Sequence, residues 1–166
     1  MQLPSEAFHT KMNQEIQEAY KKLAKKYSLP AFEAVNHELE LSTIENADFL
    51  LRDIRHKLVE RIDFFAKLIE EQLHPEGASF SSLNESSDFT ESEKKKIYVL
   101  YKKLMFIIRR GIETVVENDE NDVAAYISTT FAAWHELKKE ISAYTAKLKE
   151  SWAKDIEYKE DLGYMG

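Results

Sequence analysis

Four long stretches of the chain place apolar residues three or four positions apart, and this spacing constrains the fold more than any other feature. The clearest stretch lies within residues 42–73, where every step is of three or four residues. Its members are Ala47, Leu51, Ile54, Leu58, Ile62, Phe65, Ile69 and Leu73. Such a series lies on one face of a helix and is typical of the seam of a helical bundle or coiled coil. We therefore predict a long helix over residues 42–73.

The same periodicity predicts three further long helices, over residues 5–27, 92–117 and 122–157. Pro30 ends the first helix and suits the first turn of a short one that reaches about Leu39. The chain has only 4 Gly and 3 Pro, too few for the many tight turns of a β-sandwich or barrel. We predict an all-α fold, an antiparallel bundle of four main helices with a short helix between the first two. It would form one domain over residues 1–166, with a frayed tail from about residue 158.

Local signals mark where the predicted helices begin, end and approach each other. Ser42 with Glu45, and Thr90 with Glu93, each have the spacing of a capping box at a helix start. Between the second and third long helices, residues 74–90 hold five Ser and no Lys or Arg. We expect a loop there, held to the bundle by Phe80, Leu83 and Phe89. Gly111 lies in the middle of the third long helix and predicts either a close approach of a neighbouring helix or a kink.

Composition excludes several classes of protein. The chain has no Cys, so it has no disulfides, no cysteine nucleophile and no thiolate metal site. Its longest apolar run, residues 104–108, is far shorter than the roughly 20 residues of a membrane span. The N-terminus lacks the features of a signal peptide. A net charge of −7 disfavours extensive wrapping of nucleic acid. We expect a soluble cytoplasmic protein that does not bind membranes.

Two acidic motifs suggest metal chemistry. Glu71 and His74 have the Glu-x-x-His spacing of di-iron bundles, but those sites need two such motifs. The pair Glu15-x-x-Glu18 and Glu45-x-x-Asp48 resembles the acidic motifs of the all-α nucleotide pyrophosphohydrolases, which bind Mg²⁺ between facing helices. Here we expect Glu15 and Glu18 to face solvent and Glu45 to cap a helix. We therefore predict no metal ion, no cofactor and no catalytic residue.

The third long helix combines a wide apolar face with a basic surface. Residues 91–118 carry seven basic and four acidic side chains, and every other segment of the chain has a negative net charge. On the outward face of this helix one aromatic ring, Phe106, is surrounded by four cations. They are Lys102, Lys103, Arg109 and Arg110. This group is a candidate binding site for an acidic helix, a phosphate-bearing partner or an exposed base. The alternative is that the helix is buried on both sides, with Phe106 in the core and the cations paired with acids such as Glu113.

The last predicted helix extends beyond its neighbour. At 1.5 Å per residue, about 36 residues span roughly 54 Å, whereas the preceding helix of about 26 residues spans roughly 39 Å. The apolar seam nevertheless continues through Leu148, Trp152 and Ile156, so these residues need a cover. The cover could be residues 32–41, residues 74–90 or a second copy of the chain. We favour an internal cover, and hence a monomer over a homodimer.

The polar residues fall at helix caps and on outer faces, so we expect no polar constellation in the core. The sequence therefore favours a non-catalytic helical module that binds a protein partner, as an adaptor, regulator or assembly factor. The alternative is a small nucleic-acid or ribonucleoprotein binder that uses the basic face of the third helix. A more remote alternative is a Mg²⁺-dependent nucleotide pyrophosphohydrolase.

Overall fold

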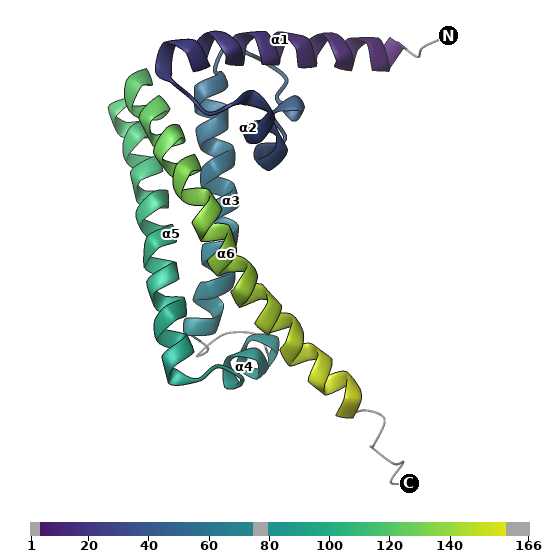
Figure 1. Ribbon diagram of the computed structural model, residues 1–166, viewed down its shortest axis with the longest axis vertical. Helices are drawn as coiled ribbons and strands as arrows, with labels where there is room; N and C mark the ends of the chain where they lie inside the picture. Colours follow the sequence, from purple (N-terminus) through teal and green to yellow (C-terminus); the bar gives the residue numbers. More distant parts are fainter. Residues whose placement is uncertain (1–3, 75–79, 159–166) are drawn as a thin grey trace. The chain divides into compact units, whose positions relative to one another are not determined.

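The computed structural model describes the backbone of residues 4–74 and 80–158 and the side chains of residues 13–74 and 81–153. Over these residues the chain is all-helical, without strands, which confirms the predicted class (Figure 1). The elements are α1 (Pro4–Tyr27), α2 (Phe32–Leu39), the 3₁₀ helix η1 (Leu41–Thr43), α3 (Leu50–Leu73), α4 (Phe80–Ser87), α5 (Glu91–Glu117) and α6 (Glu120–Tyr158). No helix in this part of the chain is long and apolar enough to cross a membrane. The frayed tail was predicted from about residue 158; Tyr158 is the last residue of α6, and residues 159–166 lie outside the described residues.

The chain divides into two compact units, and the long helices α3, α5 and α6 each contribute to both. Unit 1 comprises Met1–Ile62 and Ile107–Trp134, and unit 2 comprises Asp63–Phe106 and His135–Gly166. We predicted one domain and an antiparallel arrangement of four helices. Both predictions depend on how the two units are arranged together, so both stay predictions.

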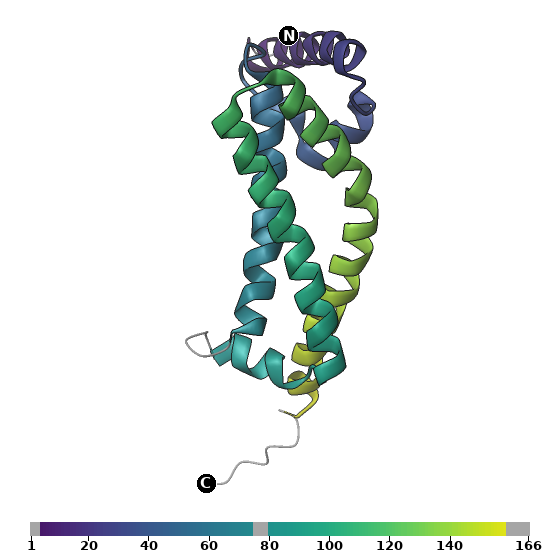
Figure 2. The same cartoon turned by 90° about the vertical axis from the view of Figure 1, so that its left-hand side faces the viewer.

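In unit 1, α1 lies across the beginning of α3 in two perpendicular views (Figures 1 and 2). The predicted stripe of α1 supplies Ile16 and Tyr20 to the core, where both are buried with Leu41 and Ile54. The Tyr20 hydroxyl donates to the carbonyl of Pro30 at 2.8 Å, which ties α1 to the turn before α2. Burial of this hydroxyl raises the pKa of Tyr20 to about 12. The segment that Pro30 begins is therefore fixed against α1 by both packing and a hydrogen bond.

The core of unit 1 contains a buried carboxylate, so the prediction of a core without a polar constellation is wrong. Glu38 on α2 accepts a hydrogen bond at 2.8 Å from the indole nitrogen of Trp134. The guanidinium of Arg61 donates to the backbone carbonyl of Glu38 at 2.7 Å, and its other nitrogen lies 3.8 Å from the carboxylate. The residues are separated by up to 96 positions in sequence. Sequence spacing could not predict this cluster, because its members lie far apart in the chain.

The start of α3 differs from the prediction. Residues 41–43 form η1, Ile44 is extended, and α3 begins only at Leu50. Leu41 and Ile44 are both buried, and the backbone N–H of Ser42 donates to the side chain of Asn36 at 3.1 Å. The predicted capping box at Ser42 is therefore wrong, because burial of its apolar neighbours accompanies a 3₁₀ turn and an extended residue here in place of the first turn of α3.

The second capping box is confirmed in unit 2. The backbone N–H of Thr90 donates to the Glu93 carboxylate at 2.8 Å, and the N–H of Glu93 donates to the Thr90 hydroxyl at 3.3 Å. These reciprocal bonds satisfy two backbone donors at the start of α5.

The predicted loop over residues 74–90 contains a helix, α4. Its side chains bond to the end of α3: Gln72 donates to Glu85 at 2.6 Å and Ser82 donates to Glu71 at 3.2 Å. Phe89 is buried as predicted, Leu83 is half exposed, and the side chain of Phe80 lies outside the described residues. The Ser-rich composition suggested a loop, but tertiary contacts favour the helix.

Candidate docking surface on α5

In unit 2, the first half of α5 has one buried face and one exposed face. Ile97, Leu100 and Leu104 are buried. On the opposite side Tyr98 and Val99 are about half exposed, and the Phe106 side chain is 71% exposed. Phe106 is therefore not a core residue of unit 2. Its exposed ring fits the binding-site interpretation of this helix face.

The four predicted cations fall into two pairs with different surroundings. Lys103 forms an ion pair with Glu140 of α6 at 2.8 Å in unit 2, and Arg110 forms one with Glu113 at 2.7 Å in unit 1. These two match the alternative in which cations are neutralised within the fold. Lys102 lies 5.7 Å from the ring centroid of Tyr98. Neither Lys102 nor the exposed Arg109 has an ion-pair partner among the described side chains.

A groove lies beside this face, between α5 and α6 in unit 2. It has a volume of about 650 Å³. Its apolar lining comprises Phe89, Ile97, Val99, Leu100, Ala143 and Tyr144. The ring centroids of Phe89 and Tyr144 lie 5.8 Å apart. We call this feature the α5–α6 groove; the sequence did not predict it, because its two walls lie about 40 residues apart in the chain.

The charges around the α5–α6 groove leave a positive excess. Its two acids are already paired, Glu140 with Lys103 and Glu93 with Lys147. The hydrogen bond from Lys147, helped by those from Thr90, lowers the pKa of Glu93 to about 2. Lys95 and Lys96 also line the groove, and within the described part of the chain they have no ion-pair partner. The groove is thus locally basic in a chain whose net charge is −7.

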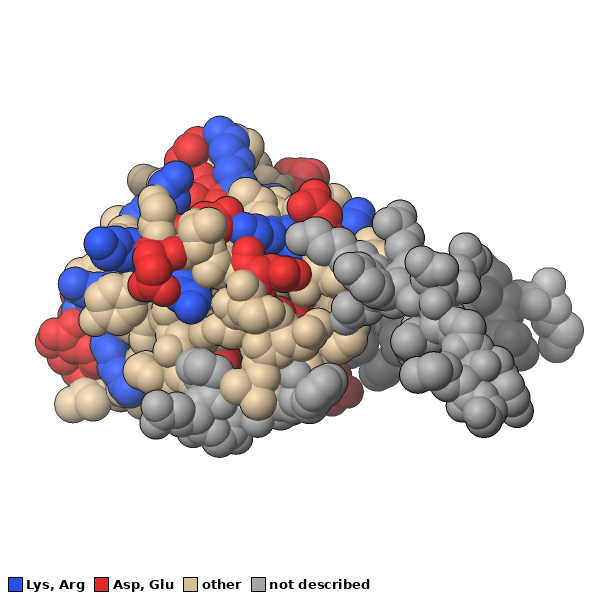
Figure 3. All heavy atoms as spheres, turned by 90° about the horizontal axis from the view of Figure 1, so that it is seen from below, with Lys and Arg blue, Asp and Glu red and all other residues tan. Residues whose placement is uncertain are grey.

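Charge on another described surface is mixed rather than of one sign. On the face shown in Figure 3, Lys and Arg (blue) alternate with Asp and Glu (red) and with uncharged residues (tan). Mixed charge of this kind is ordinary for a protein surface and does not by itself indicate a binding site.

The predicted interface residues of α6 have an internal contact. Leu148 is buried, whereas Trp152 is 40% exposed and its indole nitrogen donates to Glu85 of α4. The side chain of Ile156 lies outside the described residues. Glu85, within residues 74–90, thus contacts this end of α6, and the internal cover that the sequence favoured stays a prediction.

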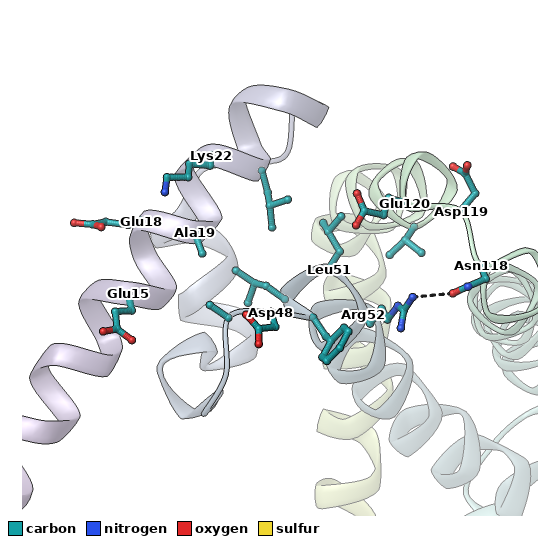
Figure 4. A pocket seen from close by; sticks show the side chains of 15 residues that line it. Glu15, Glu18, Ala19, Lys22, Asp48, Leu51, Arg52, Asn118, Asp119 and Glu120 are labelled. Carbon is teal, nitrogen blue, oxygen red and sulfur yellow. Dashed lines mark hydrogen bonds between the residues drawn. The ribbon is translucent and has the colours of Figure 1, made fainter.

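Unit 1 has a separate pocket that includes three of the four motif carboxylates. It has a volume of about 510 Å³ and is lined by Glu15 and Glu18 of α1, by Asp48, and by residues of α3 and the α5–α6 turn (Figure 4). The carboxylate of Glu18 points away from Asp48 in this view. Glu45, the fourth carboxylate, is exposed and does not line the pocket.

The pocket in unit 1 does not assemble a metal centre from these carboxylates. Over the described residues, no group of three or more His, Asp or Glu side chains is placed to hold a metal ion. The polar contact within the lining is instead a hydrogen bond from Arg52 to Asn118 at 3.0 Å (Figure 4). Glu71, the acid of the Glu-x-x-His motif, accepts a hydrogen bond from Ser82.

Comparison of the chain with protein-family models, with curated proteins and with solved structures found no match. The function is therefore inferred from the residues and their geometry.

Proposed function

We propose that the protein is a non-catalytic helical interaction module, an adaptor, regulator or assembly factor that binds a protein partner through α5. The observation that carries this proposal is the 71% exposure of Phe106. A large aromatic side chain so exposed forms no part of the core, yet it supplies the kind of contact that dominates protein interfaces. Lys102 lies one helical turn before it on the same face.

The alternative is a small nucleic-acid or ribonucleoprotein binder. Exposed aromatic rings beside cations can stack on bases, and Tyr98 and Phe106 with Lys102 provide such a set. We rank this second because Lys103 and Arg110 are neutralised by Glu140 and Glu113, and because the net charge of −7 repels phosphates.

A Mg²⁺-dependent nucleotide pyrophosphohydrolase stays the remote alternative. Such a site requires carboxylates that converge on the metal ion. Glu15, Glu18 and Asp48 line one pocket, but Glu18 points away from Asp48 and Glu45 lies outside the lining. Release of pyrophosphate from nucleoside triphosphates with Mg²⁺ would support this alternative and contradict the proposed function.

We also propose that the four main helices form an antiparallel bundle within one domain, and that the protein acts as a cytoplasmic monomer. The hydrogen bond from Trp152 to Glu85 of α4 supports the monomer, because the end of α6 then contacts a segment of its own chain. Small-angle scattering with light scattering tests the arrangement and the oligomeric state, and cell fractionation tests the location.

Photo-crosslinking at position 106 tests the proposed function. Replacing Phe106 with benzoylphenylalanine keeps an aromatic side chain at the surface. Phe64 of α3 is the matched control, because it belongs to the same unit and is 63% exposed. We expect one protein to crosslink at position 106 and not at position 64, and to bind the purified chain. Crosslinking of nucleic acid at position 106, or of the same proteins at both positions, would contradict the proposal.

A further inference from the structure

We propose that the α5–α6 groove of unit 2 binds an acidic amphipathic helix of a protein partner. This inference rests on the proposed function and specifies the chemistry of the partner. It is carried by the pattern of exposed side chains on α5, by the shape of the groove beside them and by the charges that remain unpaired.

The exposed face of α5 has the spacing of a helix-pairing seam. Lys95, Val99, Lys102 and Phe106 are all exposed and follow one another at steps of four, three and four. Alternating steps of three and four are the pattern by which one helix packs along another. The two apolar residues lie seven positions apart, and so do the two lysines. A helix packed along this face would place apolar side chains against Val99 and Phe106 and acidic ones beside Lys95 and Lys102.

The groove gives such a helix somewhere to insert its apolar side chains. Val99 belongs both to the exposed face and to the groove lining, so the two features are continuous. The α6 wall contributes Ala143, whose small side chain leaves room at the mouth. A volume of about 650 Å³ with apolar walls can take aliphatic side chains from a docked helix.

Charge selects the partner. Within the described part of the chain, Glu93 and Glu140 are occupied by Lys147 and Lys103, whereas Lys95, Lys96 and Lys102 have no ion-pair partner. An acidic helix would neutralise these lysines, and a basic helix would be repelled. Nucleic acid would meet the same cations, but a helix would also bury its apolar side chains in the groove.

Three synthetic peptides test the proposal. Each has three heptads with leucine at the seam positions, and the flanking positions are all Glu, all Gln or all Lys. Fluorescence anisotropy with the full chain measures their affinities. We expect the Glu peptide to bind about tenfold more tightly than the Gln peptide, and the Lys peptide not to bind. Equal binding of the three peptides, or none, would overturn the proposal.

Surface variants locate the binding. Lys95→Glu with Lys102→Glu should weaken the Glu peptide about tenfold and allow the Lys peptide to bind. Val99→Ser with Phe106→Ser should weaken both. Lys149→Glu is the matched control, because Lys149 is an exposed lysine of α6 in unit 2 that does not line the groove. All four substituted positions on α5 are exposed, so circular dichroism should show each variant folded. The assignment would be overturned if the substitutions on α5 left the peptide affinities unchanged, or if Lys149→Glu changed them by the same amount.

Other occupants give different results. If a single-stranded oligonucleotide displaces the Glu peptide, the occupant of the groove is nucleic acid and not an acidic helix. If the chain forms a homodimer that the Val99 and Phe106 substitutions dissociate, the occupant is a second copy of the chain. The proposed function is separable from this inference. A protein that crosslinks at position 106 while the peptides show no preference for Glu would refute the inference alone. Absence of any crosslinked protein would refute the proposed function.

Discussion

Gly111→Ala is expected to destabilise the protein, although the same change in an ordinary helix stabilises it. Gly111 lies in α5, in unit 1. A Cβ atom at this position would lie 2.6 Å from Cγ2 of Val59 and 2.9 Å from the hydroxyl oxygen of Tyr126. Both distances are shorter than a van der Waals contact. The added methyl group must therefore displace α3, α6 or their side chains, which confirms the close helix approach that the sequence suggested.

Two opposing effects set the magnitude. Alanine in place of glycine favours a helix by up to about 1 kcal/mol. Overpacking a well-filled contact costs about 1–3 kcal/mol. Val59 is β-branched and has few rotamers by which to yield, so the packing cost should exceed the gain in helix propensity. We expect a net loss of about 1 kcal/mol and a fall in Tm of about 3 °C.

Urea denaturation of Gly111→Ala, of Val59→Ala and of the double variant measures these effects. Removing the Val59 side chain makes room for the new methyl group, so the double variant should be more stable than the two single changes predict, by about 1 kcal/mol. Ser142→Ala, at an exposed position of α6, is the control for helix propensity alone. A Gly111→Ala variant more stable than wild type, or strict additivity with Val59→Ala, would refute the packing argument.

Three further changes test other parts of the structure. Phe106→Ala should change the free energy of unfolding by less than about 0.5 kcal/mol, because the ring is exposed. Leu104→Ala truncates a core side chain and should lower the free energy of unfolding by about 2–5 kcal/mol. Urea denaturation of both variants measures these changes. Glu38→Ala should cost about 1–3 kcal/mol, because it removes the carboxylate that accepts a hydrogen bond from the buried indole N–H of Trp134. The same assay measures this cost, with Glu38→Gln as the milder variant. The folded-state pKa of Glu93 is lowered to about 2 from an ordinary 4.5, so its stabilising effect is complete above pH 4.5 and is lost as the pH falls towards 2. NMR titration should give that low pKa, and Lys147→Gln should raise it towards 4.5.

The candidate site was predicted in part. The sequence identified Lys102 and Phe106 as members of an outward face, because helical spacing fixes which residues share a face. It left open whether that face was exposed, since burial depends on whether another helix covers it. It could not show that Lys103 meets Glu140 or that Arg110 meets Glu113 in preference to a ligand. The α5–α6 groove was also missed, because its walls come from segments distant in the chain.

Helical periodicity by itself determined the all-α class and most of the long helices, because a repeating apolar face is a local property of the chain. The capping box at Thr90 and Glu93 is equally local, and it formed as predicted. Tertiary structure decided the rest. It buried Leu41 and Ile44 and so delayed the start of α3 to Leu50, with residues 41–43 in the 3₁₀ helix η1 and residues 44–49 outside any helix. It also folded α4 from a Ser-rich segment through bonds to the end of α3. It also buried Glu38 beside Trp134. In each case the stabilising partner lies elsewhere in the chain, and local sequence contains no information about a contact that only folding brings together.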